Sequence, residues 1–227
     1  AILTITGPVD INQAYSLVQK HFAKKPKKAP STLKLPKRQL ETAQKVIKVK
    51  DADETKITVM WPLGKAETSL LRQLDLVDRS AGGWFNYKIK SQKKLAENVS
   101  SWLHDGEHGS MYIVTATVKD HSQTQRVKNQ IIDIADGLGR WVDKTWMAQA
   151  KRRIIYTSLY GLENPIALAE AMSQNIHDYG KPMAWVDYFK ELKGVDFKAA
   201  RESAWNHFDE DKAIIMLHTP RPDLALQ

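Results

Sequence analysis

Alternation of apolar and polar residues predicts strands in six segments of the chain. They are residues 1–6, 45–50, 56–61, 97–103, 110–118 and 213–218. The alternation is clearest where Tyr112, Val114, Ala116 and Val118 fall on one side of an extended segment, as in a half-buried strand. The third segment is expected to stop at Pro62, because proline cannot donate a hydrogen bond to a neighbouring strand.

Apolar residues that recur every three or four positions predict the helices. Asp10 is placed to cap the first helix, which ends near Phe22. Asn164 followed by Pro165 is a typical helix start, and Gly180 is a typical end. The remaining predicted helices are residues 69–79, 84–94, 127–141, 145–155, 165–179, 182–192 and 196–208.

The order of these elements predicts the fold class. The strands at 97–103 and 110–118 are joined by a short loop containing glycine, so we expect an antiparallel hairpin. Helices then occupy most of the chain up to the last strand. We therefore predict an α+β fold, with a largely antiparallel β-sheet and helices packed on one face.

Composition narrows the class of protein. The 227 residues are 42% apolar and 26% charged, which is typical of a globular protein. There is no cysteine, which excludes disulfides, cysteine zinc sites and thiol catalysis. No apolar run approaches the roughly 20 residues that cross a bilayer, so we expect no membrane span. The first residues lack the basic flank of a signal peptide.

The net charge of +8 is concentrated near the start of the chain. Residues 1–50 hold 11 of the 34 basic side chains and 2 of the 26 acidic ones, so the remainder is close to neutral. Within residues 24–44 prolines separate the lysines, as in an extended, solvated linker. The alternative is a basic nucleic-acid-binding module formed by residues 24–38, but this segment lacks aromatic residues to stack on bases. We interpret it as a linker and expect no nucleic-acid partner.

The first and last predicted strands resemble each other. Residues 1–8 align with residues 213–220 at a constant offset of 212, and an aspartate follows each segment, Asp10 and Asp223. Such a repeat indicates homologous units in tandem. We therefore predict three parts. Residues 1–23 end a preceding homologous domain, residues 24–44 form a basic proline-containing linker, and residues 45–227 form the main domain.

One motif resembles a catalytic metal site. His104, Glu107 and His108 spell H-x-x-E-H, which on a helix places two zinc ligands and a general base on one face. Gly106 within the motif and Gly109 after it disfavour a helix, and both flanks alternate like strands. We interpret the motif as a hairpin loop and expect no metal ligand and no catalytic residue in this chain. The alternative is an active zinc hydrolase that uses these three residues.

The first helix and its surroundings resemble the pitrilysin/insulinase family of zinc peptidases (M16). The resemblance lies in the opening strand, the break at Gly7-Pro8 and the helix that ends at His21-Phe22. Further pieces follow in the order that the family shows. Residues 80–118 resemble its glycine pair, amphipathic segment and hairpin, and residues 151–165 and 194–218 resemble its later helices and last strand. The order of the pieces, over nearly all of residues 1–220, carries the resemblance.

The resemblance implies a non-catalytic domain. In these peptidases homologous α+β domains occur in tandem, and the zinc ligands lie on the first helix of the catalytic domain. The matching helix here, residues 69–79, holds Asp75 and Asp78 and no histidine. This identifies the chain as similar to the inactive, C-terminal-type domain. Zinc is then expected in a partner catalytic domain, with no cofactor in this chain.

The resemblance also sets expectations for the substrate and the partner. Some inactive domains lend an arginine and a tyrosine to the partner's active site, but the matching positions here are Lys90 and Glu97. The substrate-binding residues therefore remain unassigned. We expect the domain to pack against a homologous catalytic domain, on the same polypeptide or a partner chain, and to complete a chamber for extended peptides. The compartment that the resemblance implies is the bacterial periplasm, with an organelle as the alternative.

The pattern also predicts where the aromatic residues lie and what an exposed sheet edge can bind. Tryptophans at apolar helix positions are expected in the core: Trp141, Trp146, Trp185 and Trp205. Trp61, Trp84 and Phe85 are expected at a domain interface or in a peptide groove, and the residues do not decide between the two. An exposed edge of an antiparallel sheet can also accept an extended peptide as an additional strand.

Overall fold

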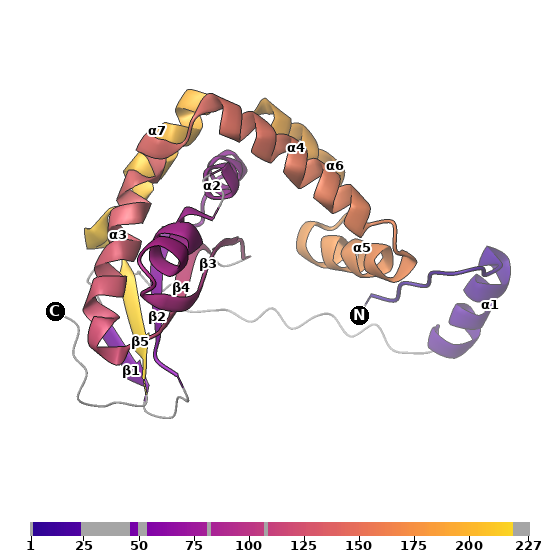
Figure 1. Cartoon of the computed structure of the whole chain (residues 1–227). Helices are drawn as coiled ribbons and strands as arrows, with labels where there is room; N and C mark the ends of the chain where they lie inside the picture. The colour runs from indigo at the N-terminus through magenta and orange to yellow at the C-terminus, as the bar shows by residue number, and fades with distance from the viewer. Residues whose placement is uncertain (1, 24–45, 50–53, 81–82, 107–108, 220–227) are drawn as a thin grey trace. The chain divides into compact units, whose positions relative to one another are not determined.

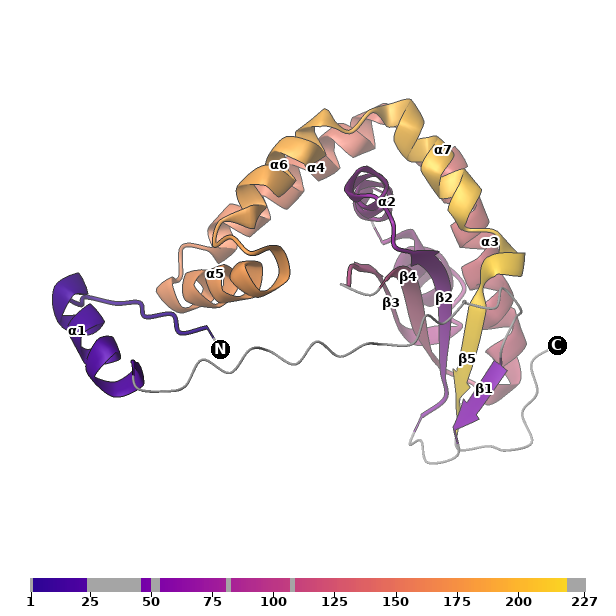
Figure 2. The ribbon, with the colours of Figure 1, turned by 180° about the vertical axis from the view of Figure 1, so that it is seen from behind.

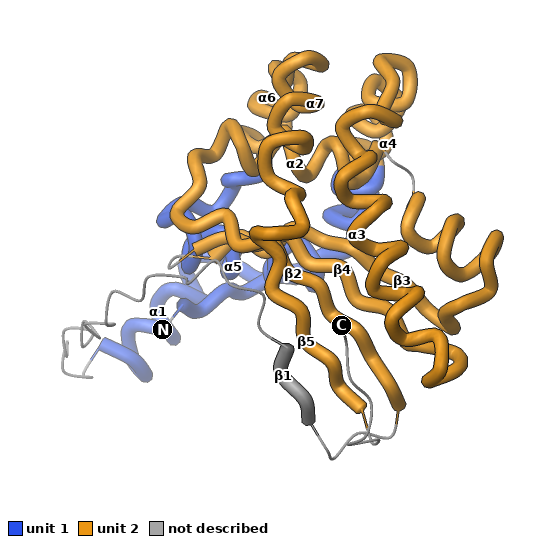
Figure 3. The backbone as a smooth tube through the Cα atoms, turned by 90° about the vertical axis from the view of Figure 1, so that its left-hand side faces the viewer, with its two compact units in different colours: residues 1–39, 157–185 blue, residues 40–156, 186–227 orange. Residues whose placement is uncertain are grey.

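The computed structural model describes residues 2–23, 46–49, 54–80, 83–106 and 109–219 (Figure 1). It divides into two compact units, coloured separately in Figure 3. Unit 1 comprises Ala1–Gln39 and Thr157–Trp185, and unit 2 comprises Leu40–Tyr156 and Val186–Gln227. The predicted linker, residues 24–44, lies outside the described residues. The boundaries predicted at 23 and 44 remain predictions.

Unit 2 contains a five-stranded sheet with the strand order β1-β5-β2-β4-β3. The pairs β5–β2, β2–β4 and β4–β3 are antiparallel. The pair β1–β5 is parallel. Their bounds are β1 Val46–Val49, β2 Lys56–Gly64, β3 Ala96–His104, β4 Ser110–Val118 and β5 Ile214–His218. The predicted hairpin is the β3–β4 pair, and the predicted largely antiparallel sheet is confirmed.

Two strand predictions were wrong in detail. Residues 2–6 form no strand, and within the described residues they pair with none, so alternation alone did not make a strand there. β2 does not stop at Pro62 but continues to Gly64, with a register shift between these two residues. The irregular pairing at that end of the strand tolerates a residue that has no N–H to donate.

Helices of unit 2 pack on one face of the sheet, as predicted. α3 (Thr124–Trp141) contacts β2 and β4, while α2 (Thr68–Ser80) and the π-helix η1 (Asn86–Gln92) contact β3. α7 (Phe197–His207) packs against both α2 and α3, and Figures 1 and 2 show α3 and α7 running side by side. The core between these layers is apolar and includes the buried side chains Ile57, Val59, Trp61, Tyr112, Val114, Ile131, Leu138 and Leu217.

The remaining helices follow their predicted signals closely. α1 is Ile11–Phe22, α4 is Lys144–Gly161, α5 is Pro165–Tyr179 and α6 is Ala184–Gly194, with short 3-10 turns at His121–Gln123 and Glu210–Lys212. Asp10 caps α1 by accepting a hydrogen bond from the backbone N–H of Gln13. Asn164 caps α5 in the same way, and Gly180 ends it in the left-handed conformation. Within the described part of the chain, no helix combines the length and apolar character that crossing a membrane requires.

The tryptophans are distributed differently from the prediction. Trp61 is fully buried and Phe85 is 2% exposed, so both belong to the core and to neither an interface nor a groove. Trp141, Trp146 and Trp205 are 39–60% exposed, and Trp185 is partly exposed. The helical pattern identifies apolar positions, but it does not say which of them meet another element.

Close packing of α3 against α7 leads to a first prediction. A Cβ atom at Gly139 would lie 2.7 Å from the backbone oxygen of Arg201. The two helix backbones would have to move apart to relieve this clash. Gly139→Ala is therefore expected to lower the free energy of unfolding by about 2 kcal/mol, despite the better helix propensity of alanine. Urea denaturation measures it. Gly194→Ala is the matched control, since a Cβ there meets nothing within 4 Å. Equal stability of the two variants would contradict the prediction.

Candidate functional site

The helix predicted to match the family's zinc helix is α2, and its carboxylates are already engaged. Asp75 accepts a 2.8 Å hydrogen bond from Nε of Arg79 on the next turn. It also accepts a 2.6 Å hydrogen bond from the hydroxyl of Tyr188 on α6. Burial, together with the charge of Asp75, raises the pKa of the Tyr188 hydroxyl. Asp75 thus joins α2 to α6 and has a structural role.

Asp78 is bonded to residues of the sheet. Its Oδ1 accepts hydrogen bonds from Oγ of Ser101 at 2.5 Å and from the hydroxyl of Tyr112 at 2.6 Å. Burial raises the pKa of Asp78 above its usual value, and these two hydrogen bonds oppose the effect only in part. Asp75 and Asp78 therefore hold α2 to its neighbours. This donor set does not fit a zinc site, since α2 offers no histidine and its carboxylates are bonded to protein groups.

The H-x-x-E-H segment lies at the β3–β4 turn. His104 is the last residue of β3, is exposed, and pairs with Met111 across the hairpin. Glu107 and His108 fall outside the described residues, so the interpretation of the motif stays a prediction. The residues that the structure does describe contain no group of three or more His, Asp or Glu side chains placed to hold a metal ion.

The positions matched to the partner-directed arginine and tyrosine are both exposed. Lys90 lies in η1. Glu97 lies in β3, where the pairing with β4 is irregular between Ala96 and Asn98. The structure therefore puts both side chains at the surface, without adding a substrate-binding role for either.

The sheet face opposite the helical layer is apolar at its centre. The register aligns Ile214 of β5, Met60 of β2, Ile113 of β4 and Trp102 of β3 in one row across four strands. We call this row the open-face row. Its first three side chains are partly exposed and Trp102 is 42% exposed. A neighbouring row consists of Met216, Thr58, Thr115 and Ser100, and the Thr58 and Thr115 hydroxyls lie 3.1 Å apart. Alternation in the strands predicted two faces but not this alignment, which depends on the register.

β3 forms one edge of the sheet among the described strands. Asn86 of η1 donates a 3.2 Å hydrogen bond from Nδ2 to the backbone oxygen of Val99 on this strand. A depression lined by Val99, Ser100 and Ser101 adjoins the same stretch, and its other wall includes Arg79 and Arg153. At this edge the carbonyl of Val99 is thus paired with Asn86, and two arginines and the carboxylate of Asp78 lie nearby.

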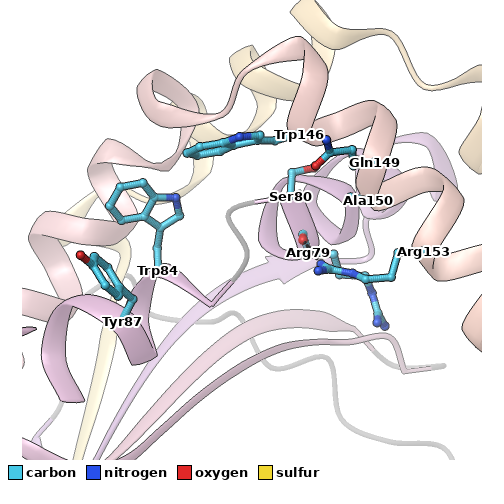
Figure 4. Close-up of a pocket in the computed structure, with 8 residues that line it drawn as sticks. All are labelled: Arg79, Ser80, Trp84, Tyr87, Trp146, Gln149, Ala150 and Arg153. Atoms are coloured by element: carbon cyan, nitrogen blue, oxygen red, sulfur yellow. Dashed lines mark hydrogen bonds between the residues drawn. The ribbon is translucent and has the colours of Figure 1, made fainter. Parts of the chain in front are cut away.

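Beside this edge lies a cavity of about 480 Å³ between α2, the start of η1 and α4. Figure 4 shows aromatic side chains at one end, Trp84, Tyr87 and Trp146, and the side chains of Arg79 and Arg153 at the other. Sequence reasoning missed this site, because Arg79 and Arg153 are 74 residues apart and belong to no motif. The one available signal was the unassigned Trp84.

A sequence model described as the peptidase M16 inactive domain matches residues 1–153. The chain belongs to this family. The resemblance drawn from the order of the sequence elements is thereby confirmed, including its assignment to the inactive type of domain.

Solved structures of two proteases and of an M16 inactive domain share the fold. A protease from Helicobacter pylori has a TM-score of 0.81 and 14% identity, with 95% of this chain and 54% of that chain covered. The periplasmic protease PqqL from Escherichia coli has a TM-score of 0.71 and 12% identity, with 95% and 25% covered. An M16 inactive domain from Pseudomonas fluorescens has a TM-score of 0.63 and 11% identity, with 82% and 45% covered.

These matches also show how long the chain is relative to the proteins it resembles. It spans about half the length of the Helicobacter pylori protease and a quarter of PqqL. A search of curated proteins found no match. The α+β architecture of M16 domains is thus shown for this chain.

Proposed function

We propose that this M16 inactive domain packs against a catalytic M16 domain and completes a chamber that holds extended peptides. The observation that carries the proposal is the open-face row, an apolar stripe across the exposed side of the sheet. Apolar side chains exposed in a contiguous row are typical of a binding or interaction surface. In this role the sheet face lines the chamber, and the helical layer supports it from behind.

The chemistry belongs to the partner. A catalytic M16 domain supplies zinc, which polarises the scissile carbonyl and activates a water molecule. In this chain the helix matched to the zinc helix holds Asp75 and Asp78 in hydrogen bonds to protein groups. Its contribution is to bind and orient the peptide and to exclude water around it.

The exposed edge of β3 is the proposed place for the peptide backbone. An extended peptide can add to a sheet edge as a further strand, so that backbone hydrogen bonds hold it without regard to sequence. The adjoining open-face row, with Trp102 on β3 itself, then offers apolar contact to alternate peptide side chains. This arrangement supports a preference for extended peptides over folded ones.

We place the protein in the bacterial periplasm, with an organelle as the alternative. The similar protease PqqL is described as periplasmic. The catalytic domain lies on the same polypeptide in one version of the proposal and on a partner chain in the other.

The experiment measures cleavage of a quenched fluorescent peptide by the catalytic M16 domain, by this chain, and by both together. We expect no cleavage by this chain alone and a rate for the pair about tenfold or more above that of the catalytic domain alone. If the two are one polypeptide, the intact protein is compared with the catalytic domain. A pair no faster than the catalytic domain alone would contradict the proposal.

A charge in the open-face row provides the structural control. Ile113→Asp places a carboxylate at the centre of the row and is expected to lower the cleavage rate of the pair about tenfold. Thr117→Asp places the same charge on the same face of β4, outside the row, and is expected to change the rate less than about twofold. Circular dichroism checks that both variants fold. Equal rates for the two variants would argue that the row does not contact peptide or partner.

A further inference from the structure

We propose that the cavity between α2, η1 and α4 captures the free C-terminal carboxylate of a peptide, with the last side chain held among its aromatic rings. This inference deepens the proposed function and rests on it, because it names the part of a peptide substrate that the domain holds. It concerns side chains that lie outside the open-face row.

The two arginines are held in place at one end of the cavity. Arg79 is fixed through Nε by Asp75, while 52% of its side chain remains exposed. Arg153 of α4 donates a 2.6 Å hydrogen bond to the backbone oxygen of Arg79, which ties α4 to the end of α2. Guanidinium groups fixed in this way lose little conformational freedom when they bind an anion.

The opposite end is a cluster of aromatic rings. The Trp84 ring lies 6.0 Å from Trp146 and 6.1 Å from Tyr87, the latter at 83° to it. Lys88 Nζ lies 5.1 Å from the centre of the Trp84 ring, which adds positive charge near this end. Figure 4 shows the rings on one side of the cavity and the two arginines on the other. An apolar or aromatic side chain fits among such rings.

The ligand chemistry follows from the lining. Among the described residues that line this cavity none is acidic, and the charged ones are Arg79 and Arg153. Planar guanidinium groups match the two oxygens of a carboxylate. About 480 Å³ lies within the range of small-ligand pockets and is too small for a folded partner. A peptide end, with one carboxylate beside one side chain, supplies both the anion and the apolar group.

Continuity with the sheet edge favours a peptide over a free small anion. Arg79 and Arg153 line both the aromatic cavity and the depression against Val99, Ser100 and Ser101 of β3. Asp78 lines the depression but not the aromatic cavity, and its Oδ1 is bonded to Ser101 and Tyr112. A peptide added along the β3 edge therefore passes the two arginines. Its terminal carboxylate can pair with them while the last side chain enters the aromatic end.

The test is calorimetric titration of the chain with an unstructured peptide that ends in phenylalanine. The same peptide with an amidated C-terminus is the matched ligand control. We expect the free acid to bind at least about tenfold more tightly than the amide, because the amide cannot form the charge-assisted hydrogen bonds with the arginines. Equal affinities, or no binding of either peptide, would overturn the inference. Displacement of the peptide by inorganic phosphate at a similar concentration would show an unspecific anion site and overturn it too.

Two neighbouring arginines of α4 provide matched variants. Arg153→Gln removes a lining guanidinium and is expected to weaken binding of the free acid about tenfold while leaving the weaker affinity for the amide unchanged. Arg152→Gln removes the same charge from an exposed residue outside the lining and is expected to bind like the unaltered chain. Equal loss in both variants would mean that net charge alone attracts the peptide.

The outcome is separable from that of the cleavage experiment. Peptide binding is measured without the catalytic domain, and cleavage is measured with it. If peptide binding depends on the free carboxylate but the chain does not raise the cleavage rate, the inference about the cavity holds and the proposed chamber function is wrong. If the chain raises the cleavage rate but peptide binding does not depend on the free carboxylate, the chamber function holds and the inference about the cavity is wrong.

Discussion

Trp61→Ala is expected to lower the free energy of unfolding by about 4 kcal/mol, the range for removing a large aromatic side chain from a core. Trp61 is fully buried in the middle of β2. Its ring lies 5.6 Å from Phe208 and 6.0 Å from Tyr112, and its indole N–H donates a 3.0 Å hydrogen bond to the backbone oxygen of Asp209. Alanine leaves a cavity among these groups and an unpaired carbonyl, because the sheet and helices cannot close the space.

Urea denaturation of three variants measures the effect. Trp205→Ala removes a ring that is 60% exposed, so we expect a loss of no more than about 1 kcal/mol. Trp61→Phe keeps an aromatic ring but removes the hydrogen bond to Asp209, so it is expected to fall between the two. A larger loss from Trp205→Ala than from Trp61→Ala would contradict the assignment of the core.

Asp78→Ala is expected to lower the free energy of unfolding by about 3 kcal/mol, since it leaves two hydroxyl groups without their acceptor. The hydroxyl of Tyr112 is on a fully buried side chain, and that of Ser101 is partly buried. Asp78→Asn is the conservative variant, because the amide oxygen can accept both hydrogen bonds at the position of Oδ1. A loss from Asp78→Asn as large as that from Asp78→Ala would show that the charge, and not the acceptor, matters.

The pH dependence of Asp78→Asn follows from the raised pKa of Asp78. Because burial raises this pKa above its unfolded value, ionisation of the Asp78 carboxyl is disfavoured in the folded protein. The stability that the protonated carboxyl contributes is lost as pH rises from the unfolded value through the raised folded one. The stability of Asp78→Asn relative to the unaltered chain should therefore be greater at neutral pH than at about pH 4, near the unfolded pKa of an aspartate. Denaturation curves at both pH values measure this change. A difference that stays constant or decreases would contradict it.

Local signals in the sequence were sufficient for most of the secondary structure. Asn164, Pro165 and Gly180 each act within one turn of α5, so the helix could be read without knowledge of its neighbours. The alternation in β4 likewise reports a buried and an exposed face on the strand itself. The first strand prediction failed because residues 2–6 needed a pairing partner, which alternation cannot supply.

Tertiary contacts account for the remaining errors. Trp205 and Trp61 were assigned the reverse of their burial, because helical periodicity identifies an apolar position without saying what covers it. The aromatic cavity was missed because Arg79 and Arg153 meet only when α4 packs beside the end of α2. The absence of histidine on that helix, by contrast, was visible directly and correctly indicated the inactive type of domain.

We propose that this chain supplies structure and leaves the chemistry to a partner. Calorimetric titration of the purified chain with zinc tests it most directly, with His104→Ala as the control. A catalytic zinc site presents deprotonated ligands in fixed geometry and binds tightly with one-to-one stoichiometry. The account predicts no such binding in either protein. Tight one-to-one binding that is lost in His104→Ala would mean that His104, Glu107 and His108 form a real metal site and that this chain performs its own hydrolysis.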